Sequence, residues 1–345
     1  MEAGRYCYTH STGEDIYLFS LRNAATEVLI SNYGAIITSY KIFRNDHVND
    51  IVLGFDNMED YLGEEYLKQY PWFGCAVGRY ANRIRDAEFL MDGKKHALSK
   101  NRGQHQLHGG IEGFDKKIWK FMGSGAEPNP WIEFSYFSKA GEEGFPGNLS
   151  VNLRYELNEP HELSYAFLAT TDAPTPVNLT HHGYFNLENG KGTIHGHTLQ
   201  IPASNYLEQD EELVVTGNLI KVEGRAHDFR SPKLIADGLT EIDEFDQSFV
   251  LDSEKNQSGL RLAAITSSER SGLRLEIYTT EPVVHFYSGK WTPKVNGKNG
   301  QTYGRFSGFC LETHVHPNAV NIPHFPNTIL RPGEEYFQKT IYRIY

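Results

Sequence analysis

Short runs of alternating apolar and polar residues, separated by turn-forming residues, recur along this chain and constrain its fold more than any other feature. In a strand, successive side chains point to opposite faces, so such alternation indicates a strand with one buried face. The runs span residues 24–30, 36–43, 131–137, 150–157, 163–170, 260–265, 273–279 and 340–345. Clusters rich in Gly, Asn, Asp and Pro separate them at 92–93, 158–160, 189–192 and 296–300. This spacing predicts an all-β fold built mainly from antiparallel strands, either a sandwich or a barrel.

The composition agrees with this fold class. The chain contains 20 Tyr and 20 Phe, residue types that favour strands, and 32 Gly, which suit numerous turns. One short helix is expected at 58–66, after a cap formed by Asp56 and Asn57. No internal repeat, low-complexity tract or linker marks a boundary, so we expect a single domain over residues 1–345.

Charge, cysteine content and hydropathy argue against several classes of protein. A net charge of −11 opposes nucleic-acid binding, because phosphate contacts need a basic surface. Three widely spaced cysteines, Cys7, Cys75 and Cys310, form neither a disulfide framework nor a cysteine-type zinc site, and they favour a reducing compartment. The N-terminal residues lack the apolar run of a signal peptide, and no segment approaches the ~20 apolar residues of a membrane helix. We therefore expect a cytoplasmic protein with no nucleic-acid or membrane partner; the sequence does not indicate its oligomeric state.

Two separated segments offer a pair of groups for proton transfer. Residues 175–187 read TPVNLTHHGYFNL, and residues 309–321 read FCLETHVHPNAVN. Neighbouring residues on a strand point to opposite faces, so only one of His181 and His182 can share a cleft with Glu312. Ordinary pKa values of about 4.3 for Glu and about 6.5 for His let one group accept a proton while the other donates one near neutrality. The alternative is a hydrogen-bonded structural histidine and a buried glutamate that an Arg or backbone amides satisfy.

Five further polar side chains interrupt apolar or Gly-rich stretches and are candidates for ligand binding. They are Asn82 and Arg83 in GRYANRI, His108 in LHGG, Asp246 in EFDQSF and His285 in PVVHFYSG. The glycines beside the LHGG histidine allow close backbone approach. Each motif alone is weak evidence, since an Arg usually forms a salt bridge and a Gly-Gly pair usually forms a turn.

Two other kinds of site compete with this interpretation. Glu312, His314 and His316 alternate along one predicted strand, so all three could face one side and bind zinc or iron. Pro317 argues that the strand ends before the last of them. A glycosidase would need two carboxylates flanking the scissile bond, which Asp246 and Glu312 could supply.

The motifs taken together resemble the aldose 1-epimerase (galactose mutarotase) family. They occur in the family's order and at its spacing, from about Thr26 to the C-terminus. The matching segments read GRYANRI, LHGGIEGFDKKIW, GEEGFPGNLSVNLRYEL, TPVNLTHHGYFNL, IPASNYLEQDEELVVTG, YTTEPVVHFYSGKW, GFCLETHVHPNAVN and LRPGEEY. The resemblance implies a single large antiparallel β-sandwich, often called a supersandwich.

The resemblance also implies an activity and a role for each candidate residue. The family interconverts the α and β anomers of free aldoses such as galactose and glucose, without a cofactor, so the expected partner is a small-molecule monosaccharide. Glu312 falls on the general base and His182 on the general acid, and we expect the two to face each other across a gap the size of a pyranose ring. The remaining family positions fall on His108, near the ring oxygen, and on Asn82, Arg83 and Asp246, which bind hydroxyl groups.

Three positions depart from the family pattern. His285 stands where the family commonly has a sugar-contacting Gln, His181 replaces an Asn beside the general acid, and His316 replaces an aromatic residue. We expect these changes to alter the shell that recognises sugar hydroxyls. They leave open a sugar-binding protein without rapid turnover. A hexose-6-phosphate epimerase of the same fold is a further alternative, but no extra basic cluster lies near the motifs.

Overall fold

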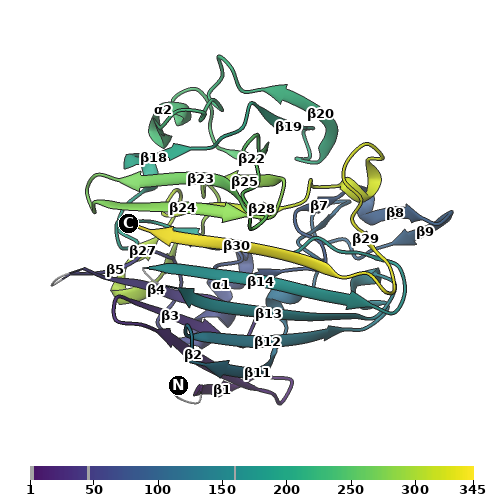
Figure 1. Cartoon of the computed structure of the whole chain (residues 1–345), viewed down its shortest axis with the longest axis horizontal. Coiled ribbons are helices and arrows are strands. Elements are labelled where there is room, and N and C mark those ends of the chain that lie inside the picture. Colours follow the sequence, from purple (N-terminus) through teal and green to yellow (C-terminus); the bar gives the residue numbers. More distant parts are fainter. Residues whose placement is uncertain (1–3, 45–46, 159–160) are drawn as a thin grey trace.

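A nine-stranded antiparallel sheet dominates the computed structural model, which describes residues 4–44, 47–158 and 161–345 (Figure 1). In order across the sheet, its strands are β11 (Lys120–Gly125), β12 (Trp131–Ser138), β13 (Leu149–Asn158), β14 (Glu162–Thr171), β30 (Tyr336–Ile344), β24 (Leu273–Thr279), β23 (Arg261–Ser268), β18 (His197–Gln200) and β21 (Lys233–Leu234). The C-terminal strand β30 lies in the middle, between β14 and β24, and so joins the two halves of the chain.

Two further sheets each take all their strands from one half of the chain. The six-stranded sheet has the order β17 (Tyr184–Phe185), β28 (Phe309–His314), β25 (Val283–Tyr287), β22 (Asp246–Val250), β19 (Asn205–Gln209) and β20 (Val215–Lys221). The five-stranded sheet contains β1 (Arg5–Thr9), β2 (Asp15–Arg22), β3 (Thr26–Ser31), β4 (Ile37–Arg44) and β5 (His47–Asp50). Five two-stranded pairs complete the strands: β6 (Ala76–Val77) with β16 (Thr180–His181), β7 (Arg83–Ile84) with β10 (Gln106–Leu107), β8 (Glu88–Met91) with β9 (Lys94–Ala97), β15 (Thr175–Pro176) with β29 (Ile329–Leu330), and β26 (Val295–Asn296) with β27 (Thr302–Tyr303).

The period-two pattern of the sequence explains the large sheet. Along β13, Leu149, Val151, Leu153, Tyr155 and Leu157 are buried, while the residues between them are less so. The largest hydrophobic cluster takes residues from all three large sheets, at positions from 19 to 344. Burial of one face of each sheet against this common core is the main stabilising term, because it is proportional to the apolar area removed from water.

The predicted antiparallel β architecture is confirmed, and each of the eight predicted runs overlaps a strand. The helix predicted at 58–66 is only partly correct. A 3-10 helix, Met58–Leu62, is followed by α1 (Glu64–Gln69), and Gly63 between them is extended. The Asn57 side chain makes no capping hydrogen bond. A second short helix, α2 (Ile235–Leu239), was not predicted.

Two predictions concern other parts of the chain. The turn predicted at 158–160 lies partly outside the described residues. Among the helices that the structure describes, none is long and apolar enough to cross a membrane.

Candidate active site

The seven side chains predicted for the site line one cleft. The space between its walls, including the part that is open to solvent, is about 580 Å³. Its lining includes Asn82, Arg83, His108, His182, Asp246, His285 and Glu312. These residues lie far apart in the sequence, so tertiary folding alone brings them together. The chemical role of each residue stays a prediction.

Three adjacent strands of the six-stranded sheet form one part of this cleft. Ser248 on β22 pairs directly with His285 on β25, and His285 pairs directly with Glu312 on β28. Residues directly opposite each other in antiparallel strands share a face of the sheet. Asp246 precedes Ser248 by two positions on β22 and therefore shares that face. The strand register thus gathers a carboxylate, an imidazole and a second carboxylate along one face.

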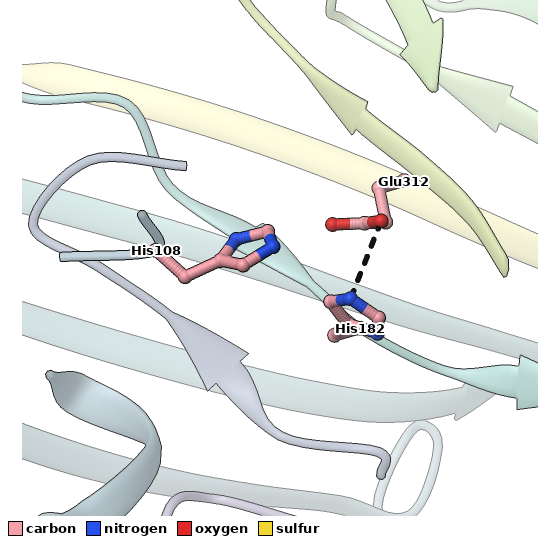
Figure 2. Close-up of side chains that lie close together, drawn as sticks. All are labelled: His108, His182 and Glu312. Atoms are coloured by element: carbon pink, nitrogen blue, oxygen red, sulfur yellow. Dashed lines mark ion pairs between the residues drawn. The ribbon is translucent and has the colours of Figure 1, made fainter. Parts of the chain in front are cut away.

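Glu312 and His182 are in near contact. Oε1 of Glu312 lies 3.5 Å from Nε2 of His182, and both residues are almost completely buried (Figure 2). His182 follows β16, whose pairing with β6 anchors it beside β28. Oε2 of Glu312 is buried without a hydrogen-bond partner among the described residues. The gap that the sequence led us to expect between the two groups is absent.

Burial shifts the pKa values of the pair in opposite directions. It raises the pKa of Glu312 to about 7; the His285 imidazole opposes this effect and the Asp246 carboxylate adds to it. It lowers the pKa of His182 to about 3, so this imidazole is neutral near pH 7. Near neutrality the carboxyl group therefore populates both of its protonation states.

His108 reaches the cleft from a tight loop after β10. Its own φ is +50°, and Gly109 follows with a φ of +87°. A Cβ atom on Gly109 would lie 1.9 Å from the carbonyl oxygen of Gly78, so only glycine fits there. The Asn82 backbone N–H donates to Nδ1 of His108 over 3.3 Å, which places the proton of the neutral ring on Nε2. His108 therefore offers a hydrogen-bond donor, and burial keeps its pKa well below the usual value.

Asp246 is held as a carboxylate by its neighbours. Nε2 of His285 lies 2.8 Å from Oδ1 of Asp246, and the Ser248 hydroxyl lies 2.9 Å from the other ring nitrogen of His285. Burial would raise the pKa of Asp246, but the hydrogen bond from His285 and the charges of His285 and Arg83 outweigh it and lower the pKa. Nε of Arg83 is buried without a hydrogen-bond partner in the part of the chain that the structure describes. Both side chains are thus available to a polar ligand.

Aromatic walls and one further cation were not predicted from the sequence. The cleft is also lined by Gln69, Tyr70, Pro71, Trp72, Arg102, Leu107, Tyr184, Tyr287 and Trp291. The Trp72 ring centroid lies 4.9 Å from that of His108 and 6.1 Å from that of His182. The run YPWF at 70–73, just before the GRYANRI motif, is the sequence signal that could have identified this wall.

Only one of the three departures from the family pattern lies in the cleft. The His181 ring packs against Tyr155 and Tyr165, with centroids 6.0 and 5.4 Å away, on the opposite side from His182. The His316 ring packs against Phe325 at 4.5 Å. The expectation that all three changes alter the hydroxyl-recognition shell is therefore wrong for His181 and His316. It stays a prediction for His285, whose side chain lines the cleft.

The alternative metal-binding face at Glu312, His314 and His316 is not formed. Strand β28 ends at His314, as Pro317 indicated, so His316 leaves the face. Among the described residues, the group whose potential ligand atoms all lie within 4.8 Å of one another is instead His108, His182 and Glu312 (Figure 2). A metal ion bound by this group would share His182 and Glu312 with proton transfer.

Comparisons with known proteins agree with this combination of fold and cleft. The sequence matches the Aldose 1-epimerase family over residues 17–343. It is 41% identical to galactose mutarotase from Bos taurus over 332 residues, which cover 94% of this chain and 93% of the relative. It is 36% identical to aldose 1-epimerase from Escherichia coli (strain K12), with 96% of each chain covered.

Solved structures show the same architecture. The aldose epimerase homologue from C. elegans superposes with a TM-score of 0.86 at 29% identity, covering 96% of this chain and 99% of that one. Galactose 1-epimerase from Lactobacillus acidophilus NCFM superposes with a TM-score of 0.84 at 27% identity, covering 98% and 97%. The family match, together with the cleft that holds a buried carboxyl group and a buried imidazole, identifies the protein as an isomerase that acts on sugars. The chain belongs to the aldose 1-epimerase family, as its motifs predicted.

Proposed function

We propose that this enzyme interconverts the α and β anomers of free aldohexoses such as galactose and glucose, with Glu312 as general base and His182 as general acid. The observation that carries the proposal is the 3.5 Å contact between Oε1 of Glu312 and Nε2 of His182 in a cleft lined by polar and aromatic side chains. The names of the mammalian relatives, galactose mutarotase, support the choice of galactose.

The close approach of the two groups suits this reaction better than a wide gap. The anomeric hydroxyl and the ring oxygen of an aldopyranose are bonded to the same carbon atom. A base that serves the first and an acid that serves the second must therefore lie close together on one side of the substrate. The 3.5 Å separation of the pair meets this requirement.

Ring opening moves two protons, one onto Glu312 and one off His182, so the total number of protons on the pair does not change. Glu312 removes the proton of the anomeric hydroxyl, the bond between the anomeric carbon and the ring oxygen breaks, and the ring oxygen takes the Nε2 proton of the neutral His182 ring. The negative charge thereby passes from Glu312 to His182, which is left as an imidazolate beside the newly protonated Glu312. The aldehyde that results rotates about its bond to the next carbon. Reclosure with the two roles reversed returns both protons and yields either anomer. Each proton transfer typically contributes about 10²–10⁴-fold to the rate.

The other polar side chains of the cleft suit substrate orientation. The Arg83 guanidinium and the Asn82 amide offer donors to hydroxyl oxygens, and the Asp246 carboxylate offers acceptors. His108, with its proton on Nε2, can donate to an oxygen near the ring. Fixing the sugar in this way avoids much of the entropic cost of reaction, an effect that can be as large as the proton transfer itself.

A phosphorylated sugar is the second candidate substrate. Lys290, Lys294 and Arg305 line a groove that shares Trp291 with the cleft, so basic residues do lie nearby, contrary to the sequence-based expectation. Asp243 and Glu244 pair with Lys290, which leaves the groove with little net positive charge. We therefore rank the free sugar first.

Polarimetry tests the proposal directly. Freshly dissolved α-D-galactose, α-D-glucose and their 6-phosphates are followed with and without the enzyme, and the free sugars are expected to equilibrate faster with enzyme. Acceleration of the 6-phosphates alone would overturn the proposed substrate. Sugar binding, seen as a change in tryptophan fluorescence, together with mutarotation no faster than in buffer would overturn the proposed catalysis.

We also propose a cytoplasmic location. All three cysteines are free, and two of them are buried, which suits a reducing compartment. Cell fractionation with an antibody against the chain would test this; recovery in a membrane or secreted fraction would contradict it.

A further inference from the structure

Cys310 contacts the edge of the His182 ring that faces away from Glu312. Its Sγ lies 3.5 Å from Nδ1 of His182, within hydrogen-bonding distance for sulfur, and both residues are buried. Cys310 and Glu312 are two positions apart on β28 and therefore share one face of the strand. One strand thus contacts both ring nitrogens of the general acid, Nδ1 through a thiol and Nε2 through a carboxyl group.

The ring cannot easily turn away from these two contacts. Tyr184 stacks on His182 with centroids 5.2 Å apart and an angle of 22° between the planes. Trp72 is also roughly parallel to the ring, at 6.1 Å and 25°. The carbonyl oxygen of His182 accepts the backbone N–H of Gly74 over 2.9 Å, so its main chain is fixed as well.

The thiol is able to donate in this contact. Burial raises the pKa of Cys310 well above its ordinary value, and the nearby Glu312 charge raises it further, so the sulfur keeps its proton near neutrality. A neutral imidazole has one nitrogen with a proton and one without. If Nδ1 carried the proton, the lone pair of Nε2 would face the oxygen of the ionised Glu312, the form that acts as base, at 3.5 Å, an unfavourable contact between two acceptors.

We propose that the Cys310 thiol donates a hydrogen bond to Nδ1 of His182 and thereby fixes the imidazole in the tautomer that carries its proton on Nε2, which makes Cys310 a positioning residue. This tautomer gives the two members of the pair different roles. The nitrogen that faces the substrate is a proton donor, so Glu312 serves as the base of the pair. This assignment rests on the proposed function, but the tautomer itself can be measured without activity.

Nitrogen NMR of ¹⁵N-histidine-labelled protein tests the tautomer, with the His182 signals identified by their loss in His182→Asn. Wild type is expected to show one tautomer, protonated on Nε2. Cys310→Ala removes the donor and is expected to give a mixture of tautomers and a kcat about two- to tenfold lower, the effect of one neutral hydrogen bond, with little change in KM. Cys310→Ser keeps a donor and is expected to restore the single tautomer and most of kcat.

Cys75→Ala is the matched control. Cys75 is a second buried cysteine of the same hydrophobic cluster, but its thiol donates to the carbonyl oxygen of Trp72 and not to His182. It is expected to leave the tautomer and kcat unchanged. A Cys310→Ala protein that keeps the wild-type tautomer overturns the inference, as does a Cys310→Ser protein that resembles Cys310→Ala. A wild-type enzyme without mutarotation overturns the proposed function instead and leaves the tautomer measurement valid.

Discussion

Replacing Glu312 by Gln removes one proton-transfer group and one buried charge, and these two losses have opposite effects on the enzyme. The side chain is 1% exposed, and burial raises its pKa to about 7 from the ordinary 4.5. As an amide of nearly the same shape, Gln neither ionises nor accepts a proton. We expect the variant to lose activity by about 10²–10⁴-fold and to gain stability at alkaline pH.

The size of the stability gain follows from the pKa. Ionisation of this carboxyl group costs more in the folded than in the unfolded chain. The wild type therefore has its full stability below pH 4.5 and loses part of it as the pH rises through about 7. The difference between about 7 and 4.5, at 1.36 kcal/mol per pH unit, corresponds to about 3 kcal/mol. Glu312→Gln cannot ionise, so it is expected to gain about 3 kcal/mol relative to wild type between pH 4 and pH 8.5.

Urea unfolding at pH 4, 6 and 8.5, without sugar, measures this gain, and polarimetry measures the activity. Glu281→Gln is a matched control, because burial also raises the pKa of Glu281 to about 7 and this residue does not line the cleft. It is expected to show a similar pH-dependent gain with wild-type activity. A Glu312→Gln variant that turns over as fast as wild type would refute the assigned base. A stability difference that does not change with pH would refute the argument from burial.

Three further predictions concern other parts of the cleft. Because Glu312 must be ionised to act as base, kcat/KM is expected to rise with pH through about 7, which a pH series by polarimetry checks. Gly109→Ala combines a φ of +87° with a steric clash, so it is expected to lower the free energy of unfolding by more than the 1–3 kcal/mol typical of backbone strain. Gly93→Ala, at a φ of +76° with open space around it, is the control and is expected to show the cost of strain alone. Thermal unfolding of the two variants measures the difference. His285→Gln removes the imidazole that holds Asp246 and is expected to change the galactose-to-glucose ratio of KM more than kcat, so equal KM changes for both sugars would count against it.

The sequence by itself determined the kind of structure and predicted which groups react. Alternation with a period of two along residues such as 149–158 gives each strand one buried face, and this local property is visible without any knowledge of pairing. The motifs around Glu312 and His182 likewise predicted the pair, because a carboxyl group among apolar residues is costly unless it is paired or functional. The family assignment followed from the same motifs.

Tertiary structure alone decided how those groups are arranged. The separation of 3.5 Å between Glu312 and His182, and the place of Cys310 at the other edge of the ring, depend on the pairing of strands that are distant in the sequence. In the folded chain, the rings of His181 and His316 pack against aromatic side chains, although their positions in the motifs suggested a role in sugar recognition. Residue spacing fixes which face a side chain takes along its own strand, but only long-range register fixes which atoms it meets across the cleft.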